Sequence, residues 1–166
     1  KLWEQEKGPW EKSQKEATHA FNGVQFSQFF EPFLGKIDQQ FVFFPNITYP
    51  SDYDVGFQIG NEIVCIAPPP LAWGDSPPWP YDEPTQITYS YRAAMMVYGK
   101  VLLRNYLHHH AKELEEITSI DLPVTDQFKA QYPSWEAQFS TLFLSATVAM
   151  YLEEHVDEKE FKSYML

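Results

Sequence analysis

Apolar side chains recur at steps of three and four residues near the start of the chain and again over most of its second half. Such spacing places them on one face of a helix. It predicts helical structure over residues 1–35, with a kink or a break at Pro32, because proline removes a backbone donor. It also predicts helices over Ala93–Ile117 and Trp135–His155, the second capped by Ser134, and a short closing helix.

Between these segments the pattern changes to short runs of β-branched and aromatic residues. Val55–Ile59 and Glu62–Ala67 are typical of two strands, joined at Gly60-Asn61 by residues that tolerate the positive φ of a tight turn. A third run ends at Pro45. Because the prolines at 68–70 cannot donate ladder hydrogen bonds, we expect Glu62–Ala67 to stop there or to lie at a sheet edge.

Residues 68–84, PPPLAWGDSPPWPYDEP, have the composition of a long loop. Two interpretations fit this loop. Its rings can form a rigid cover over the core, or Trp73, Trp79 and Tyr81 can form the wall or lid of a pocket, because long ordered loops often serve binding sites.

Together the patterns predict one α+β domain over residues 1–166, which is mainly helical. It would be helical over 1–35, form a small antiparallel sheet over 40–67, carry the Pro/Trp-rich loop over 68–84 and be helical again over 85–166. A chain of 166 residues, 44% hydrophobic and 21% charged, is long enough and apolar enough to bury a core.

The net charge of −11 disfavours nucleic acid as a partner, since phosphate binding requires clustered Lys and Arg. No apolar run approaches the roughly 20 residues that span a bilayer, so we expect no membrane insertion. The single cysteine, Cys65, lies in a predicted strand and is typical of a buried structural thiol. The sequence is compatible with an exported protein and with a cytoplasmic one.

Three adjacent histidines, His108–His110, lie late in a predicted helix. Adjacent helical residues point about 100° apart, so the three cannot bind one ion together. A metal site here would pair His109 or His110 with Glu113 and would need further ligands, for which His155 and His19 are candidates. The simpler interpretation is a polar helix end that interacts well with the helix dipole.

Residues 101–116, VLLRNYLHHHAKELEE, resemble the active-site helix of the zincin metallopeptidases, whose signature is HExxH. Arg104 stands at the first His, Asn105 at the general-base Glu and His108 at the second His. Residues 144–156, LSATVAMYLEEHV, are similar to the gluzincin helix that supplies the third ligand, with Ala146 at the position of its Glu. The strand Glu62–Ala67 stands where zincins place the strand that pairs with substrate.

The resemblance implies a zincin-like arrangement without the chemistry, a pseudoenzyme. Arg104 would repel Zn²⁺, and Asn105 cannot accept a proton from bound water. The expected function is then peptide or protein binding in a degenerate cleft, by strand addition along an edge.

Two alternatives stay open. One is an active metal-dependent hydrolase whose ligands come from His108, His109, His110 and Glu113, with His155 or Glu153 as a further ligand. The other is a structural or interaction domain whose Pro/Trp-rich loop is buried against a partner chain.

Overall fold

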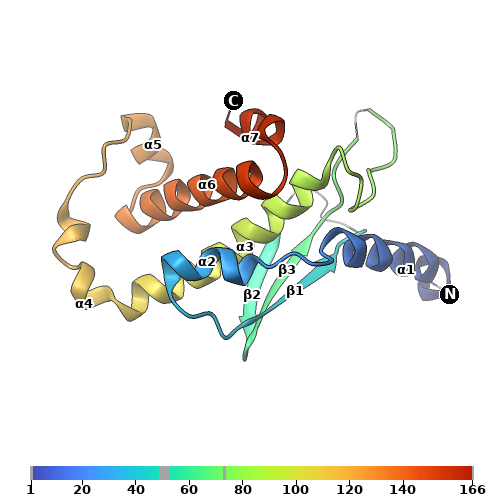
Figure 1. The fold of residues 1–166 in the computed structure, drawn as a ribbon, viewed down its shortest axis with the longest axis horizontal. Coiled ribbons are helices and arrows are strands. Elements are labelled where there is room, and N and C mark those ends of the chain that lie inside the picture. The colour runs from blue at the N-terminus through green and yellow to red at the C-terminus, as the bar shows by residue number, and fades with distance from the viewer. Residues whose placement is uncertain (1, 49–52, 73, 166) are drawn as a thin grey trace. The chain divides into compact units, whose positions relative to one another are not determined.

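The computed structural model describes residues 2–48, 53–72 and 74–165, and its fold is α+β, as the sequence predicts (Figure 1). Within these residues the strands are β1 (Gln40–Pro45), β2 (Val55–Ile59) and β3 (Glu62–Ala67). The helices are α1 (Leu2–Ala20), α2 (Phe26–Leu34), α3 (Ile87–His109), α4 (Ala111–Leu114), α5 (Asp126–Gln131), α6 (Trp135–His155) and α7 (Glu158–Met165), with a 3₁₀ turn at Ile117–Ser119.

The chain forms two compact units, one over residues 1–98 and one over 99–166. The first contains α1, α2, the sheet and the first half of α3. The second contains the end of α3 and all later helices. The organisation of residues 1–166 as a single domain stays a prediction.

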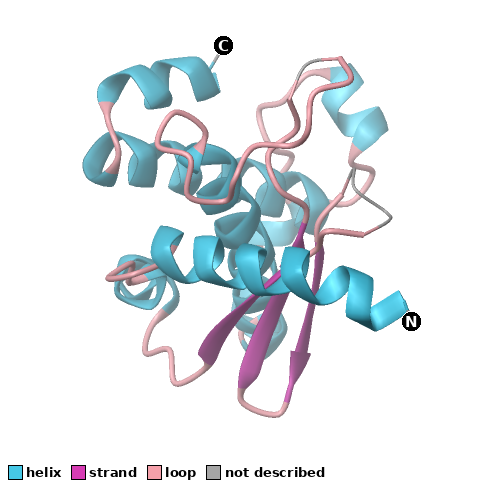
Figure 2. Ribbon diagram, turned by 90° about the vertical axis from the view of Figure 1, so that its right-hand side faces the viewer, coloured by secondary structure: helices cyan, strands magenta, loops and turns pink. Residues whose placement is uncertain are grey.

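The sheet is mixed, with strand order β1-β3-β2 (Figure 2). β2 and β3 form the predicted antiparallel hairpin, and Gly60 in its turn has a φ of 57°. The prediction of a wholly antiparallel sheet is wrong for β1, which pairs with β3 in parallel, Gln40 opposite Glu62. β3 comes last in the sequence but lies between β1 and β2 in the sheet. It runs antiparallel to β2 and parallel to β1.

β3 is therefore the central strand, and its expected place at a sheet edge is wrong. The prolines at 68–70 end the strand, which is one of the two outcomes that their missing N–H groups allow. Of the two outcomes expected at Pro32, a kink or a break, the break is wrong. α2 continues through Pro32 to Leu34, held by the buried rings of Phe26 and Phe30.

One face of the sheet packs against the middle of α3. Phe41 stacks on Tyr98 with ring centroids 4.4 Å apart, and Gly56 lies against Val97. The other face carries apolar side chains that are partly open to solvent: Phe44, Val55, Phe57 and Ile59. The fully buried side chains of β3, Ile63, Cys65 and Ala67, lie on the α3 side, so most of the core of the first unit lies on that side of the sheet.

Tyr81 fastens the Pro/Trp-rich loop to the end of the sheet. Its side chain is fully buried, and its hydroxyl donates to the carbonyl oxygen of Ala67 at 2.7 Å, at the end of β3. Ser90 Oγ donates to the carbonyl oxygen of Tyr81, and a hydrogen bond of 2.7 Å between His19 Nδ1 and Asp82 Oδ2 connects the loop to α1. These contacts favour the interpretation of the loop as a cover.

In the second unit, α6 begins and ends at the predicted residues. Ser134 caps it by accepting a hydrogen bond from the N–H of Ala137 at 3.1 Å. The predicted helix over Ala93–Ile117 is instead divided, since α3 begins earlier, at Ile87, and ends at His109 before the short α4. Among the described residues, no helix is both long enough and apolar enough to cross a membrane.

The contact between Gly56 and α3 gives a first prediction. A Cβ at residue 56 would overlap Val97 Cγ1, so Gly56→Ala should lower the free energy of unfolding by about 1–3 kcal/mol. Chemical denaturation would measure this. Gly8→Ala is the control, because a Cβ there meets nothing within 4 Å and alanine favours the helix by up to about 1 kcal/mol. Equal stability of the two variants would contradict the packing of β2 on α3.

A second prediction concerns the Tyr81 hydroxyl. Tyr81→Phe should cost about 1 kcal/mol of stability, because Ala67 loses one donor but still accepts from the N–H of Asn46 at 2.8 Å. Burial also raises the pKa of Tyr81 and of Tyr98 above the usual value near 10. Both hydroxyls therefore favour the folded state fully below about pH 10 and lose that contribution as the pH rises further.

The check is a set of denaturation curves from neutral to strongly alkaline pH. Tyr81→Phe should lose less stability over the alkaline range than the unsubstituted protein. Tyr89→Phe is the matched control, since Tyr89 is 50% exposed, and it should follow the unsubstituted protein. A steeper alkaline loss in Tyr81→Phe would show that this hydroxyl is not the buried group described here.

Candidate functional site

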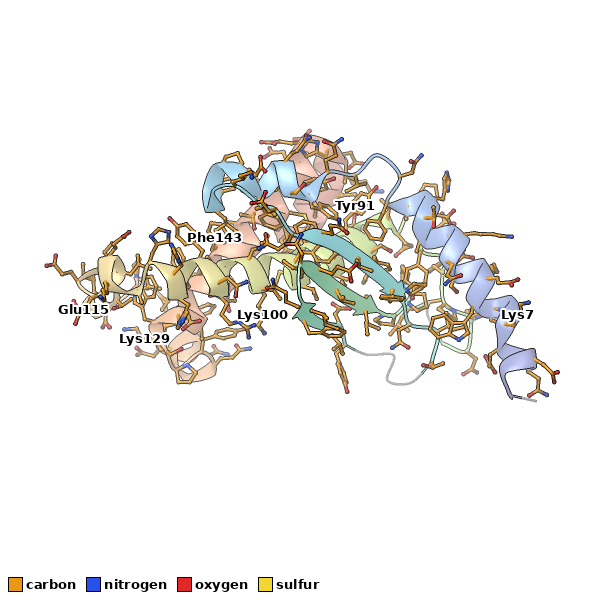
Figure 3. All side chains as sticks on the ribbon, turned by 90° about the horizontal axis from the view of Figure 1, so that it is seen from below. Lys7, Tyr91, Lys100, Glu115, Lys129 and Phe143 are labelled. Atoms are coloured by element: carbon orange, nitrogen blue, oxygen red, sulfur yellow. The ribbon has the colours of Figure 1, made fainter. Side chains whose placement is uncertain are left out.

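A groove of about 870 Å³ follows the outer side of β1 in the first unit. α1 lies beside β1, and Figure 3 shows β1 as the strand nearest to α1 and α2. The groove is lined by the second half of α1, the start of α2 and all of β1: Gln14, Ala17, Thr18, Phe21, Val24, Gln25, Phe26, Ser27, Gln28, Gln39, Gln40, Phe41, Val42, Phe43, Phe44, Pro45 and Tyr98. Its volume is in the range of about 300–1,000 Å³ typical of ligand pockets.

Backbone groups of alternate residues of β1 point to its outer edge. The N–H of Gln40 donates to the carbonyl oxygen of Asn61 at 2.8 Å, and that of Asn46 donates to Ala67. In a parallel ladder the even-numbered residues of β1 therefore face β3, and the N–H and C=O groups of Phe41 and Phe43 face away from it. In residues 2–48, 53–72 and 74–165, no hydrogen bond joins these outward groups to another segment.

The lining of the groove is uncharged. It combines the polar side chains of five glutamines, one serine and one threonine with aromatic rings such as those of Phe21, Phe26 and Tyr98. In a chain of net charge −11 this is an uncharged strip beside a row of backbone donors and acceptors. Such a surface can hold an extended peptide by main-chain hydrogen bonds, with pockets for alternate side chains.

Three of the positions that the zincin resemblance selects lie together in the second unit. Arg104, Asn105 and His108 line a pocket of about 600 Å³ between the end of α3, the segment after it and the start of α6. The other lining residues are Leu107, Ala111, Leu114, Thr118, Trp135 and Glu136.

Ala146, the fourth of these positions, does not line that pocket. Its side chain is exposed, and it lies ten residues after Glu136 in α6. At the rise of an α-helix, ten residues correspond to about 15 Å along the helix axis. α6 meets the pocket with its first turn, whereas the resemblance places the third-ligand position farther along the helix. The four positions therefore do not converge on one site.

The candidate metal ligands separate along the end of α3. α3 ends at His109, and His110 begins the next turn, where its Nδ1 lies 2.8 Å from Glu113 Oε2. His108 lines the pocket of the second unit, and His155 lies at the end of α6, where its ring packs on Tyr151 with centroids 4.6 Å apart. Within the described residues, no three side chains of His, Cys, Asp or Glu are grouped so that they could hold a metal ion.

The three predicted pocket-wall residues have different environments. Tyr81 is an anchor in the core, and Trp79 is 42% exposed. Neither lines the groove or the pocket described above. Trp73 lies outside the described residues.

Cys65 is buried in the middle of β3, as its sequence position predicts. Burial raises the pKa of its thiol far above the usual range, and the negative charge of Asp54 raises it further. The thiolate is the nucleophilic form, so the buried position of this cysteine disfavours a nucleophilic role and favours a structural one.

No sequence motif marks the groove along β1, because the groove is formed by backbone groups and uncharged side chains. One signal was present in the sequence: the run QQFVFFP, residues 39–45, ends in a proline, and prolines within sheets are typical of edge strands. That signal would have identified β1, and not β3, as the strand with a free side.

Comparisons with protein-family models, curated proteins and solved structures give no match. The site is therefore interpreted from its own residues.

The separation of the histidines gives a prediction about zinc. Protein equilibrated with zinc and then desalted should retain no stoichiometric metal, because a stable zinc site needs at least three protein ligands. Elemental analysis measures this, and a chelator should leave the melting temperature unchanged. One equivalent of zinc that is lost in His110→Ala would contradict the prediction and favour the hydrolase alternative.

Proposed function

We propose that this chain is a non-catalytic peptide-binding domain that holds an extended segment along the outer edge of β1. The observation that carries the proposal is the row of outward backbone groups at Phe41 and Phe43, which face a groove instead of a covering strand. An added strand would pair with these groups as a fourth member of the sheet, and its alternate side chains would meet the aromatic and amide lining.

The choice of β1 over β2, the other edge strand, follows from the groove. β1 is flanked by α1 and α2, whose side chains give an incoming strand further apolar contacts. Main-chain pairing alone is sequence-independent, so selectivity would come from this flanking wall.

The zincin resemblance stays a proposal about the origin of the second unit. It rests on the sequence likeness around Arg104, Asn105 and His108, whose common pocket follows from helical spacing alone, and the position of Ala146 does not support it. A permanent cation and an amide at the first two motif positions favour a function without hydrolysis. The peptide site proposed here lies in the first unit and does not depend on this origin.

Amide hydrogen exchange tests the proposal with a short synthetic peptide of alternating threonine and valine. In the free protein the N–H groups of Val42 and Phe44 should be protected by the ladder to β3, whereas those of Phe41 and Phe43 should exchange quickly. Adding the peptide should protect Phe41 and Phe43. The same peptide with alternate backbone nitrogens methylated should give no protection, because it cannot donate to the edge.

Two neighbouring substitutions form a matched pair. Gln39→Pro removes one outward N–H and should weaken peptide binding about two- to tenfold with little change in stability. Gln40→Pro removes the N–H that donates to Asn61 and should destabilise the fold instead. Protection of β1 amides that does not alternate, or full binding by the methylated peptide, would refute strand addition at this edge.

A further inference from the structure

The helix α6 carries apolar residues on two opposite faces (Figure 1). Its buried face is centred on Val148 and includes Leu144, Tyr151 and Leu152. At about 100° per residue, the opposite face consists only of apolar residues between Glu136 and Glu153. These residues, the outer face of α6, are Phe139, Leu142, Phe143, Ala146 and Met150. A surface helix normally presents polar residues on the side away from its core, so this composition is typical of a helix that is covered on both sides.

The outer face of α6 is partly open to solvent. Leu142 is 41% exposed and Met150 is 39% exposed. Phe139 and Phe143 are half-buried, and their rings continue a stack that begins at Trp135, with centroid distances of 4.9 and 5.9 Å. Because stacked rings have few alternative rotamers, this surface loses little side-chain entropy when a partner covers it.

Both ends of the outer face carry exposed carboxylates: Glu136 at its start, and Glu153 and Glu154 at its end. In residues 2–48, 53–72 and 74–165, Glu136 and Glu153 form no ion pair. Arg104 lines the same pocket as Glu136, so the end at Glu153 and Glu154 is the more negative one. Glu153 follows Glu136 by 17 residues, which corresponds to about 25 Å along the helix axis.

We propose that the outer face of α6 binds an amphipathic helix of a partner protein, and that this helix carries Lys or Arg at the end that meets Glu153 and Glu154. Its apolar stripe would pack on the side chains from Phe139 to Met150, and its cations would pair with the two carboxylates. The binding surface lies in the second unit, and the proposal does not rest on the groove along β1.

The charges favour this partner over a second copy of α6. Antiparallel pairing of two copies would bring Glu136 of one against Glu153 of the other, and parallel pairing would bring Glu153 against Glu153. Like charges that meet across an interface are unfavourable. The same carboxylates disfavour the anionic surface of a lipid bilayer.

The probe is a fluorescent amphipathic peptide of about 18 residues, long enough to span the outer face. It has leucine at steps of three and four residues, alanine and glutamine elsewhere, and lysines in its last turn, where they also suit the helix dipole. One control peptide has the same composition in scrambled order, and another has glutamate in place of lysine. Fluorescence anisotropy with the full chain should show that the lysine peptide binds about tenfold or more tightly than either control.

Leu142→Asp tests the apolar part of the surface. It should lower the affinity for the lysine peptide about tenfold or more, because a charge replaces an apolar contact at the centre of the outer face. Leu71→Asp is the matched control, since Leu71 is 62% exposed and belongs to the first unit, and it should leave the affinity unchanged. Both positions are exposed, so both variants should keep the melting temperature of the unsubstituted protein.

A change of charge tests the acidic end. Glu153→Lys combined with Glu154→Lys should reverse the preference, so that the glutamate peptide binds more tightly than the lysine peptide. Lysine is also favourable in the last turn of a helix, so this variant should fold. Glu115→Lys combined with Glu116→Lys makes the same change of charge between α4 and the 3₁₀ turn, and should keep the preference for the lysine peptide.

Several results would overturn the proposal. Equal affinity for the lysine peptide and its scrambled form would show that an apolar stripe is not recognised, and unchanged affinity in Leu142→Asp would place the peptide elsewhere. A dimer in sedimentation that Leu142→Asp dissociates would assign the face to a second copy. Binding to phosphatidylcholine vesicles that Leu142→Asp abolishes would assign it to a lipid surface. None of these results bears on the protection of Phe41 and Phe43, so this proposal and the peptide groove can fail separately.

Discussion

The pairing of β3 on both of its sides is the constraint from which the rest of the first unit follows. Its odd-numbered residues bond to β1 and its even-numbered residues to β2, so none of its backbone groups is left for a ligand. β1 thereby becomes an edge, and α1 and α2 turn that edge into a groove. The carbonyl oxygen of Ala67, at the end of β3, also receives the Tyr81 hydroxyl that holds the long loop in place.

The elements that could be predicted from the sequence are those that local chemistry determines. Ser134 starts α6 through its own hydroxyl, and Gly60 allows the β2–β3 turn through its positive φ. The place of β1 depends on contacts between residues about twenty positions apart, such as Gln40 and Glu62, and no local pattern encodes them. The prolines at 68–70 correctly predict where β3 ends, but they do not indicate which strands pair with it.

The candidate sites divide in the same way. Arg104, Asn105 and His108 are close in sequence on one helix, so their common pocket follows from helical spacing. Ala146 was joined to them only by a long-range expectation about α6, and the pocket meets that helix ten residues earlier. Tyr81 fitted either a cover or a pocket wall from its place in a long loop, and its hydroxyl, which donates to a buried carbonyl oxygen, places the ring in the core as part of a cover. The groove along β1 is built from main-chain groups, which a search for reactive side chains cannot find.

Pro45 limits what an open edge would otherwise permit. An uncovered strand invites copies of the same chain to pair with it and to grow into fibres. Proline has no N–H to offer, so the row of donors on the outer side of β1 stops after Phe43. A brief guest segment can still be accommodated, while unlimited stacking of whole molecules is interrupted at that residue. The edge is thus protected against self-assembly at one end, while the donors before Pro45 stay available for the segment that we propose to bind there.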